Sequence, residues 1–455
     1  MKDTPRPPVG AMPEAAPPVE DPTRLARHPT RARPGEVHPL YCVWEITLAC
    51  DLGCRHCGSR AGDARPEELT TEQCLGVVDQ LKELGIREVT LIGGEAYLRE
   101  DWHVIAAYIR ELGMVCGMTT GAFALTEERV QQAVDAGMTT ISVSIDGLEA
   151  THDAQRGRKG SWRAAVEASE RIAQSSIRLC TNTQINRLSM PELPALAELL
   201  IQIGSRAWQT QLTVPMGNAA DRPDLLLQPY DLLELFPLLM WIKQEKLVPN
   251  RIHLMPGNNI GYFGPYEEVL RFGGHQGAHW SSCSAGRWSI GLEADGKIKG
   301  CPSLPSNTYT GGNLHTDGLV DTVQNSDELR YMRERTVDDL WGYCRTCYYA
   351  DVCKAGCSWT SHVFFDKPGN NPYCIHRALD HEKRGQRERL RKVVGAPGRP
   401  FDNGRFEITA EPIPEVDGDP SPTIGGVQLD KVMKLATTDR GTWAKADLTG
   451  KLKTS

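Results

Sequence analysis

Apolar and polar positions follow an alternating strand and helix pattern from Tyr41 to about residue 246. Short apolar runs such as REVTLIGG at 87–94 have the pattern of buried strands, and apolar residues recur every three or four positions between them, as in amphipathic helices. The expected strands cover 41–48, 87–94, 115–119, 140–145, 178–184 and 207–213. The expected helices cover 71–84, 102–112, 127–136, 162–173, 192–203 and 231–246. Strict alternation predicts a parallel sheet in an α/β fold, and six units predict a partial (β/α)6 TIM-like barrel, open on one side.

The pattern changes on both sides of this barrel region, 37–248. Residues 1–36 hold nine of the 30 prolines and almost no large apolar residue, which predicts a disordered arm. Gly, Pro, Asn and aromatic residues dominate 249–282, expected to be a connecting segment, and a cysteine-rich domain is expected over 283–380. The charged run Ala378–Val394 predicts a C-terminal helix that continues to residue 395. An extended tail is expected over 396–455.

Composition narrows the environment of the chain. Its 455 residues carry a formal charge of −7, whereas nucleic-acid binding favours a basic surface. The most apolar run, Leu232–Ile242, contains Glu234 and Pro237 and is shorter than the roughly 18 residues of a membrane span. The N-terminus has no secretory signal. We therefore expect a cytoplasmic protein with no nucleic-acid or membrane partner. In that reducing compartment, 14 mostly clustered cysteines indicate metal binding or redox chemistry.

The first cysteine cluster directly follows the first expected strand. Cys50, Cys54 and Cys57 have the spacing C-x3-C-x2-C, at the carboxyl edge where barrel folds place their chemistry. Three thiolates can hold three irons of a [4Fe–4S] cluster and leave the fourth iron open to a substrate. A structural zinc site would need a fourth ligand, and the nearest candidate, His56, lies between two of the cysteines.

This cluster resembles the signature of the radical S-adenosylmethionine (radical SAM) enzymes, and Gly93-Gly94-Glu95 resembles the GGE motif of that family. The resemblance implies that S-adenosylmethionine binds beside a [4Fe–4S] cluster and yields a 5′-deoxyadenosyl radical. It also implies that Gly93, Gly94 and Glu95 bind the methionine amino group. Residues near the next three strand ends are implied to hold the ribose and carboxylate: Thr120, Ser144 and Asn182. Ordinary hydrogen bonding at strand ends is the alternative for these three.

The second cysteine region resembles the SPASM domain, which follows the barrel in many radical SAM enzymes. Its seven cysteines have the spacing of that domain, and their odd number and the reducing compartment disfavour a zinc ribbon and a disulfide framework. The resemblance implies two auxiliary [4Fe–4S] clusters, and thus three clusters in all. The implied ligands are Cys283, Cys301 and Cys357 for the first, with one open iron, and Cys344, Cys347, Cys353 and Cys374 for the second. The other four cysteines are expected in the core: Cys42, Cys74, Cys116 and Cys180.

The run from Cys50 to Glu100 resembles maturases that modify ribosomally made peptides (RiPP maturases). That resemblance implies a precursor peptide or protein substrate and an electron donor of the flavodoxin or ferredoxin type. Because the arm is short and rich in proline, we expect the leader to be bound either by a separate leader-binding protein or by the surface of the barrel and the cysteine-rich domain. A cofactor- or carbohydrate-modifying enzyme is an alternative, as is an iron–sulfur carrier. A sulfatase-type maturase is disfavoured because Pro302 follows Cys301 where that branch has an aspartate base. No catalytic acid or base stands out; polar candidates near the motifs are Tyr97, Glu100, Asp101, His152, Arg156 and His362.

Overall fold

A computed structural model describes residues 37–272, 282–414, 423–424 and 427–428, so the expected N-terminal arm and most of the tail lie outside it. One curved sheet organises the molecule, with strands in the order β10-β9-β8-β1-β2-β3-β4-β5-β6-β7. Its parallel part contains β1 (Tyr41–Thr47), β2 (Glu88–Gly93), β3 (Val115–Thr120), β4 (Thr140–Ser144), β5 (Arg178–Ile185), β6 (Ala207–Leu212) and β7 (His253–Pro256). The six predicted strands and the partial barrel are confirmed. β7 is an addition, because the expected connecting segment contributes a seventh parallel strand.

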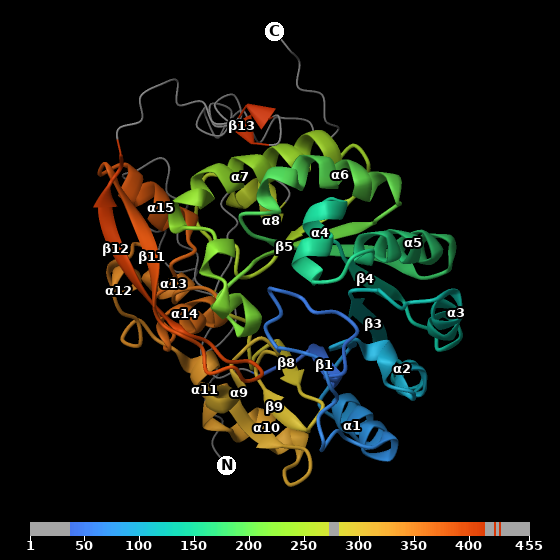
Figure 1. The fold of residues 1–455 in the computed structure, drawn as a ribbon. Coiled ribbons are helices and arrows are strands. Elements are labelled where there is room, and N and C mark those ends of the chain that lie inside the picture. Colours follow the sequence, from blue (N-terminus) through green and yellow to red (C-terminus); the bar gives the residue numbers. More distant parts are fainter. Residues whose placement is uncertain (1–36, 273–281, 415–422, 425–426, 429–455) are drawn as a thin grey trace, which may run out of the picture.

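Helices cover the outside of the parallel strands (Figure 1). They are α1 (Thr71–Glu83), α2 (Trp102–Glu111), α3 (Glu127–Asp135), α4 (Glu149–Arg156), α5 (Ser161–Gln174), α6 (Leu193–Gln202) and α7 (Leu232–Trp241), the last continued by the π-helical turn η6 (Ile242–Leu247). Short 3-10 turns are η1 (Ala96–Leu98), η2 (Met190–Glu192), η3 (Gly217–Asp221), η4 (Pro223–Leu225) and η5 (Pro229–Asp231). Thr70 and Gln73 form the capping box that begins α1. Helix α4 was not predicted, since it is short and polar.

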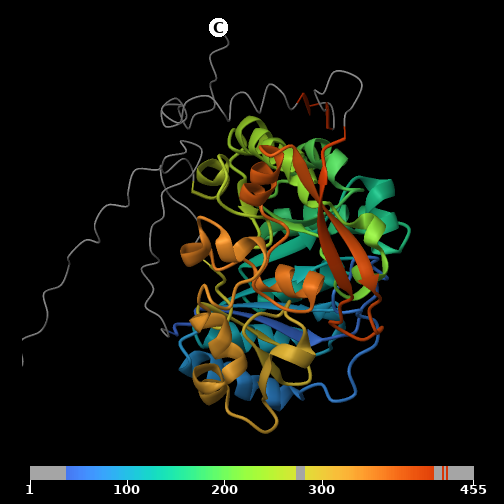
Figure 2. The same cartoon turned by 90° about the vertical axis from the view of Figure 1, so that its left-hand side faces the viewer.

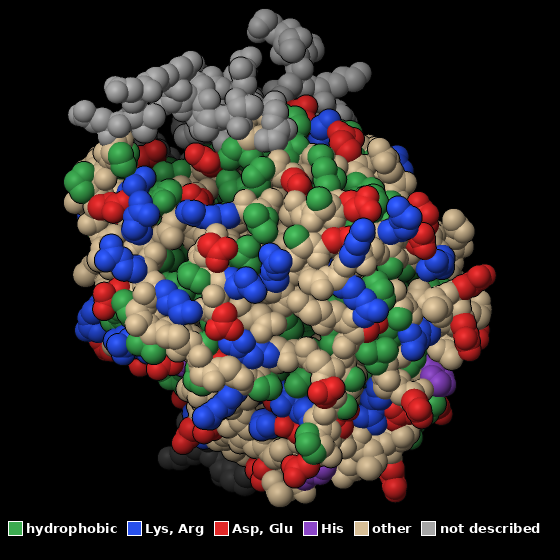
Figure 3. Space-filling view, in the orientation of Figure 1, with side chains coloured by type: hydrophobic (Ala, Val, Ile, Leu, Met, Phe, Trp, Pro, Cys, Tyr) green, Lys and Arg blue, Asp and Glu red, His purple; other side chains and the backbone are tan. Residues whose placement is uncertain are grey.

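By length and composition alone, one helical stretch, Pro223–Leu247, could cross a membrane. Its most apolar window is 67% buried inside the structure, so it packs as a core helix does and is weak evidence for a span. On the face drawn in Figure 3, Lys and Arg side chains are mixed with Asp and Glu, without a large patch of either sign.

The cysteine-rich domain extends the same sheet. β8 (Ser289–Leu292) pairs in parallel with β1, and β9 (Lys297–Lys299) and β10 (Thr310–Asn313) follow as antiparallel neighbours. The helices of the connecting segment and of this domain are α8 (Glu267–Phe272), α9 (Ser306–Tyr309), α10 (Leu319–Asn325), α11 (Asp327–Glu334), α12 (Tyr343–Thr346), α13 (Ala350–Cys353), α14 (Ser358–Phe365) and α15 (Ile375–Glu382). The barrel and the cysteine-rich domain therefore share backbone hydrogen bonds.

The predicted helix over Ala378–Val394, with its extension to 395, is wrong. Helix α15 ends at Glu382, Gly385 takes a left-handed φ of 66°, and residues Gln386–Val394 form strand β11. Its side chains alternate, with Glu388 and Leu390 buried. The extended tail is also partly wrong, because β12 (Arg405–Pro412) pairs with β11 in an antiparallel hairpin that lies across the face of the molecule in Figure 2. A further small pair joins β13 (Thr423–Ile424) to β14 (Val427–Gln428).

Candidate functional site

The loop after β1 gathers Cys50, Cys54 and Cys57. Burial, and then the nearby Glu95, raise the pKa of the Cys50 thiol to about 12, and the other two thiols add to this effect. Burial likewise raises the pKa of Cys54 to about 12, although a hydrogen bond from Arg156 Nη1 to its Sγ, at 3.7 Å, opposes this. Thiolates held this close together repel one another and need a cation, and three sulfur ligands on one loop suit an iron–sulfur cluster.

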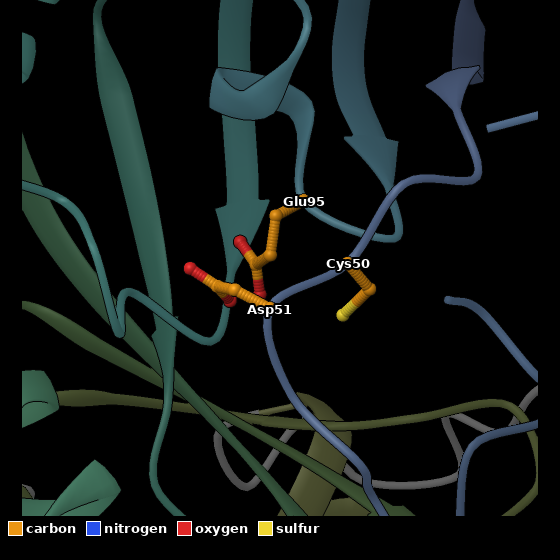
Figure 4. A group of neighbouring side chains, drawn as sticks. All are labelled: Cys50, Asp51 and Glu95. Carbon is orange, nitrogen blue, oxygen red and sulfur yellow. The ribbon is translucent and has the colours of Figure 1, made fainter. Parts of the chain in front are cut away.

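Glu95 faces this loop. Figure 4 shows Cys50, Asp51 and Glu95 turned toward one another, and their ligand atoms all lie within 4.8 Å. The Glu95 carboxylate accepts hydrogen bonds from the Thr120 hydroxyl and from the Gly121 amide, the latter at 2.6 Å. Burial raises the pKa of Glu95 to about 7. The structure thus brings together the predicted residues Cys50, Glu95 and Thr120.

The two glycines before Glu95 allow β2 to end against the cysteine loop. A Cβ at Gly94 would lie 2.1 Å from the Ala49 carbonyl oxygen, and one at Gly93 would lie 2.5 Å from the Thr47 oxygen. These contacts leave no room for a side chain. The glycines therefore fix where the GGE segment meets the loop that carries the cysteines.

Ser144 and Asn182 lie opposite each other on the neighbouring strands β4 and β5. Ser144 is buried, and the Asn182 Nδ2 donates to Ser142 Oγ at 3.3 Å. Neither donates to Glu95, whose hydrogen bonds come from Thr120 and Gly121, and their assignment to S-adenosylmethionine stays a prediction.

A buried ionic network contacts the first cysteine loop. Arg156 Nη2 lies 2.7 Å and His56 Nε2 lies 3.1 Å from the same oxygen of Asp146, which is fully buried. Burial alone would raise the pKa of Asp146, but Arg156 and His56 hold it well below its usual range. The carboxylate is therefore ionised and keeps Arg156 beside Cys54. Burial, then the Arg156 charge, lowers the pKa of nearby His152 to about 3, so His152 is neutral.

Sequence reasoning named His152 and Arg156 only as polar candidates and missed Asp146. The available signal was the aspartate that ends the strand segment ISVSIDG at 141–147. His56, considered above as a zinc ligand, is instead paired with Asp146.

A cavity of about 190 Å³ opens beside Gly93, between the barrel and the cysteine-rich domain. Barrel residues that line it include Glu45, Gln184 and Gln211, and the cysteine-rich domain adds Pro302 and Trp359. Phe401, from the loop between β11 and β12, completes the wall. Burial raises the pKa of Glu45 to about 7 although Arg65, 3.0 Å away, lowers it. The cavity thus combines a carboxyl group, amide groups and apolar side chains.

The seven cysteines of the second region form two groups. Cys344, Cys347, Cys353 and Cys374 line a common small cavity, and Cys344, Cys347 and Cys374 each raise the pKa of other thiols in this group. Burial raises the pKa of Cys357 to about 12, and Cys283 and Cys301 add to this effect. These groups correspond to the two ligand sets that the resemblance to the SPASM domain implies.

Tyr262 was not singled out in the sequence, yet it lies between these two groups. It lines the cavity of the four-cysteine group, and its backbone oxygen lies 3.7 Å from Cys374 Sγ. Burial, followed by the charge of Cys357, raises its pKa. Of the remaining cysteines, Cys42, Cys74 and Cys116 are buried as predicted. Cys180 is only half-buried and lines a separate large cavity, so the core prediction is wrong for it.

Comparison with known proteins fits this geometry. Residues 44–194 match the radical SAM superfamily. The chain is 27% identical over 350 residues to the AdoMet-dependent heme synthase of Methanosarcina barkeri. The aligned region covers 74% of this chain and 97% of that protein. It is 27% identical over 347 residues to the mycofactocin maturase MftC of Mycolicibacterium smegmatis, with 74% and 83% covered.

Solved structures share the fold. Streptococcus suis SuiB bound to S-adenosylmethionine superposes with a TM-score of 0.56 at 15% identity, over 74% of this chain and 76% of SuiB. Native anSMEcpe with bound AdoMet superposes with a TM-score of 0.60 at 14% identity, over 75% and 95%. The α/β fold with a parallel sheet is confirmed.

Taken together, the fold, the cysteine loop and the sequence match identify a radical SAM domain at residues 44–194. The chain is therefore an enzyme that carries a radical SAM domain, and this class uses a [4Fe–4S] cluster and S-adenosylmethionine.

Proposed function

We propose that this enzyme modifies a ribosomally made precursor peptide by radical chemistry. The observation that carries the proposal is the similarity to mycofactocin maturase MftC over 347 residues, which is longer than the barrel alone. The related fold of SuiB, which was also solved bound to its precursor peptide SuiA, is consistent with it. Pro302 lines the cavity where a sulfatase-type maturase would place an aspartate, and its carbonyl accepts a hydrogen bond from Lys299.

The proposed ligand sets follow the three cysteine groups. Cys50, Cys54 and Cys57 would hold the cluster that binds S-adenosylmethionine, and Glu95 and Thr120 would contact that cofactor. Cys283, Cys301 and Cys357 would hold one auxiliary cluster, and the four-cysteine group would hold another. A flavodoxin or ferredoxin would supply electrons in the cytoplasm, and a separate protein would bind the leader of the precursor.

The bound cluster and cofactor would supply a radical that removes a hydrogen atom from the substrate. The protein positions the parts. Asp146 holds Arg156 against Cys54, Gly93 and Gly94 fix the GGE segment, and the cavity beside Gly93 orients the substrate and excludes water.

A second candidate function is supported by a different similarity. AdoMet-dependent heme synthases are equally similar in identity, and one is covered over 97% of its length. An iron tetrapyrrole is therefore the alternative substrate class.

Mass spectrometry of anaerobic reactions separates the two candidates. Cluster-reconstituted enzyme would be given S-adenosylmethionine, a reductant and either short peptides encoded beside its gene or an iron coproporphyrin. We expect a mass change in one peptide, and none with the Cys50→Ala/Cys54→Ala/Cys57→Ala variant. Conversion of the tetrapyrrole alone would contradict the proposal and favour the second candidate.

A further inference from the structure

The loop between β11 and β12 returns to the loop that carries the first cysteines. Arg60, three residues after Cys57, donates from Nε to Asp402 Oδ1 at 2.9 Å. The Gly217 amide donates to the Asp402 carbonyl oxygen at 2.8 Å. The Asp402 carboxylate also accepts from the Arg399 amide at 2.9 Å, within its own loop. Asp402 therefore anchors the 395–404 loop to the barrel mouth.

Phe401 stands beside this anchor in an unusual conformation. Its φ is 57°, in the left-handed region that bulky side chains avoid, so its backbone is strained. The ring is nevertheless buried and forms part of the cavity wall beside Gly93. Backbone strain held in place by surrounding contacts is common at ligand-binding positions. Because Asp402 is fixed on both sides, the chain is held in the conformation that points Phe401 into this wall.

Buried charges lie on the Phe401 ring and are already neutralised. Lys299 Nζ lies 4.2 Å from the ring centroid, and Arg65 lies 5.9 Å from it. Lys299 pairs with Glu293 at 2.5 Å, and Arg65 pairs with both Glu293 and Glu45. Both cations contact the Phe401 ring. Because each is already paired with a carboxylate, neither requires an anionic ligand in the cavity.

The opposite wall offers paired amides. Gln184 on β5 donates from Nε2 to Gln211 Oε1 on β6 at 3.2 Å, and both side chains line the cavity. Among the described residues, Gln184 Oε1 and Gln211 Nε2 have no hydrogen-bond partner. One acceptor and one donor in this arrangement match the two hydrogen-bonding groups of a peptide unit.

We infer that the cavity binds one apolar residue of the peptide substrate, with its side chain against Phe401 and Met216 and its peptide unit at Gln184 and Gln211, so that Phe401 is a specificity-determining residue. The volume of about 190 Å³ suits one such side chain, since a cavity of about 150 Å³ can hold benzene. The inference deepens the proposed function and rests on a peptide being the substrate.

Direct binding of blocked amino acids tests the inference. The full chain, reconstituted and saturated with S-adenosylmethionine, would be titrated with N-acetyl-leucinamide, N-acetyl-phenylalaninamide and N-acetyl-serinamide, with Kd measured by ligand-observed NMR. We expect the two apolar amides to bind at least tenfold more tightly than the serine amide. Phe401→Ala should reduce that difference to threefold or less, and Phe401→Leu should retain most of it.

Val394→Ala is the matched control, because Val394 lies on the same hairpin and its side chain is 45% exposed. It should bind all three amides as the natural protein does. Iron content and circular dichroism of each variant check that the fold is retained. If Phe401→Ala does not fold, the amide preference of Phe401→Leu is the test.

Three results would overturn the inference: no preference for the apolar amides in the natural protein, which includes no binding of any amide; an unchanged preference in folded Phe401→Ala; or complete loss of the preference in folded Phe401→Leu. Failure of the proposed function looks different. In that case no precursor peptide changes mass, whatever the amide preference of the cavity.

Discussion

Arg377 and Glu388 form a buried ion pair that joins α15 to β11. The guanidinium donates from Nε and Nη2 to the two carboxylate oxygens at 2.5 and 2.6 Å, and Nη1 donates to Asn370 Oδ1. Burial alone would raise the pKa of Glu388, but His381 and Arg377 lower it below its usual value. The pair is therefore ionised, and it lies on the buried face of the hairpin.

Glu388→Gln should lower the free energy of unfolding by about 3 kcal/mol, because it leaves the buried Arg377 charge without its partner. Urea denaturation followed by circular dichroism would measure this. Glu411→Gln is the control, since it removes a carboxylate that pairs with Arg387 and Arg389 on the exposed side of the same hairpin, where solvent screens the charges. A loss from Glu411→Gln as large as that from Glu388→Gln would contradict this account.

At the scale of elements, the hairpin is attached through one face of β12. Phe406 is buried, and its ring meets Phe364 of α14 edge to face at a centroid distance of 5.4 Å. The neighbouring Thr409 points to solvent. Hydrophobic packing of this strand against α14 therefore holds the 395–404 loop at the cavity.

Phe406→Ala should destabilise the protein by about 3–4 kcal/mol, the usual effect of deleting a buried aromatic ring. Because the loop depends on the strand, limited proteolysis should also cleave faster near residues 395–404. Thr409→Ala should change neither measurement appreciably. Unaltered proteolysis in Phe406→Ala would mean that Asp402 holds the loop without help from the strand.

The parallel strands were predictable because they read as short apolar runs between amphipathic helices. β11 was not, because Arg, Glu, Lys and Gln are good helix formers and conceal an alternation of period two. Cys50, Cys54 and Cys57 could be grouped by their spacing in one loop, whereas the division of the seven cysteines of the second region came from the resemblance to the SPASM domain. Phe401 and the Arg60–Asp402 pair were not, because that pair joins positions 342 residues apart in the chain. Asp146 is intermediate: its strand was predicted, but its partners His56 and Arg156 come from two other segments.

At the scale of the whole molecule, β8 joins the cysteine-rich domain to β1, the strand that leads into the first cysteine loop. Four residues of β1 pair with β8, from Tyr41 with Ser289 to Trp44 with Leu292. Loss of metal from one domain should therefore also destabilise the other, because the two domains share a sheet and metal binding is coupled to folding.

The three cysteine groups predict how iron is divided. Anaerobically reconstituted protein should hold about 12 Fe, and replacing either Cys50/Cys54/Cys57 or Cys344/Cys347/Cys353/Cys374 by Ala should remove about four. Only the first replacement should abolish cleavage of S-adenosylmethionine outright, because only that group lies beside Glu95. The second should lower the thermal unfolding midpoint, because the domain would lose a cluster that joins segments far apart in the chain, and metal binding is coupled to folding. Cys116→Ala, in the barrel core, should retain all of the iron. Iron analysis giving about eight Fe in the natural protein, unchanged by the four-cysteine replacement, would remove that group from the ligand assignment.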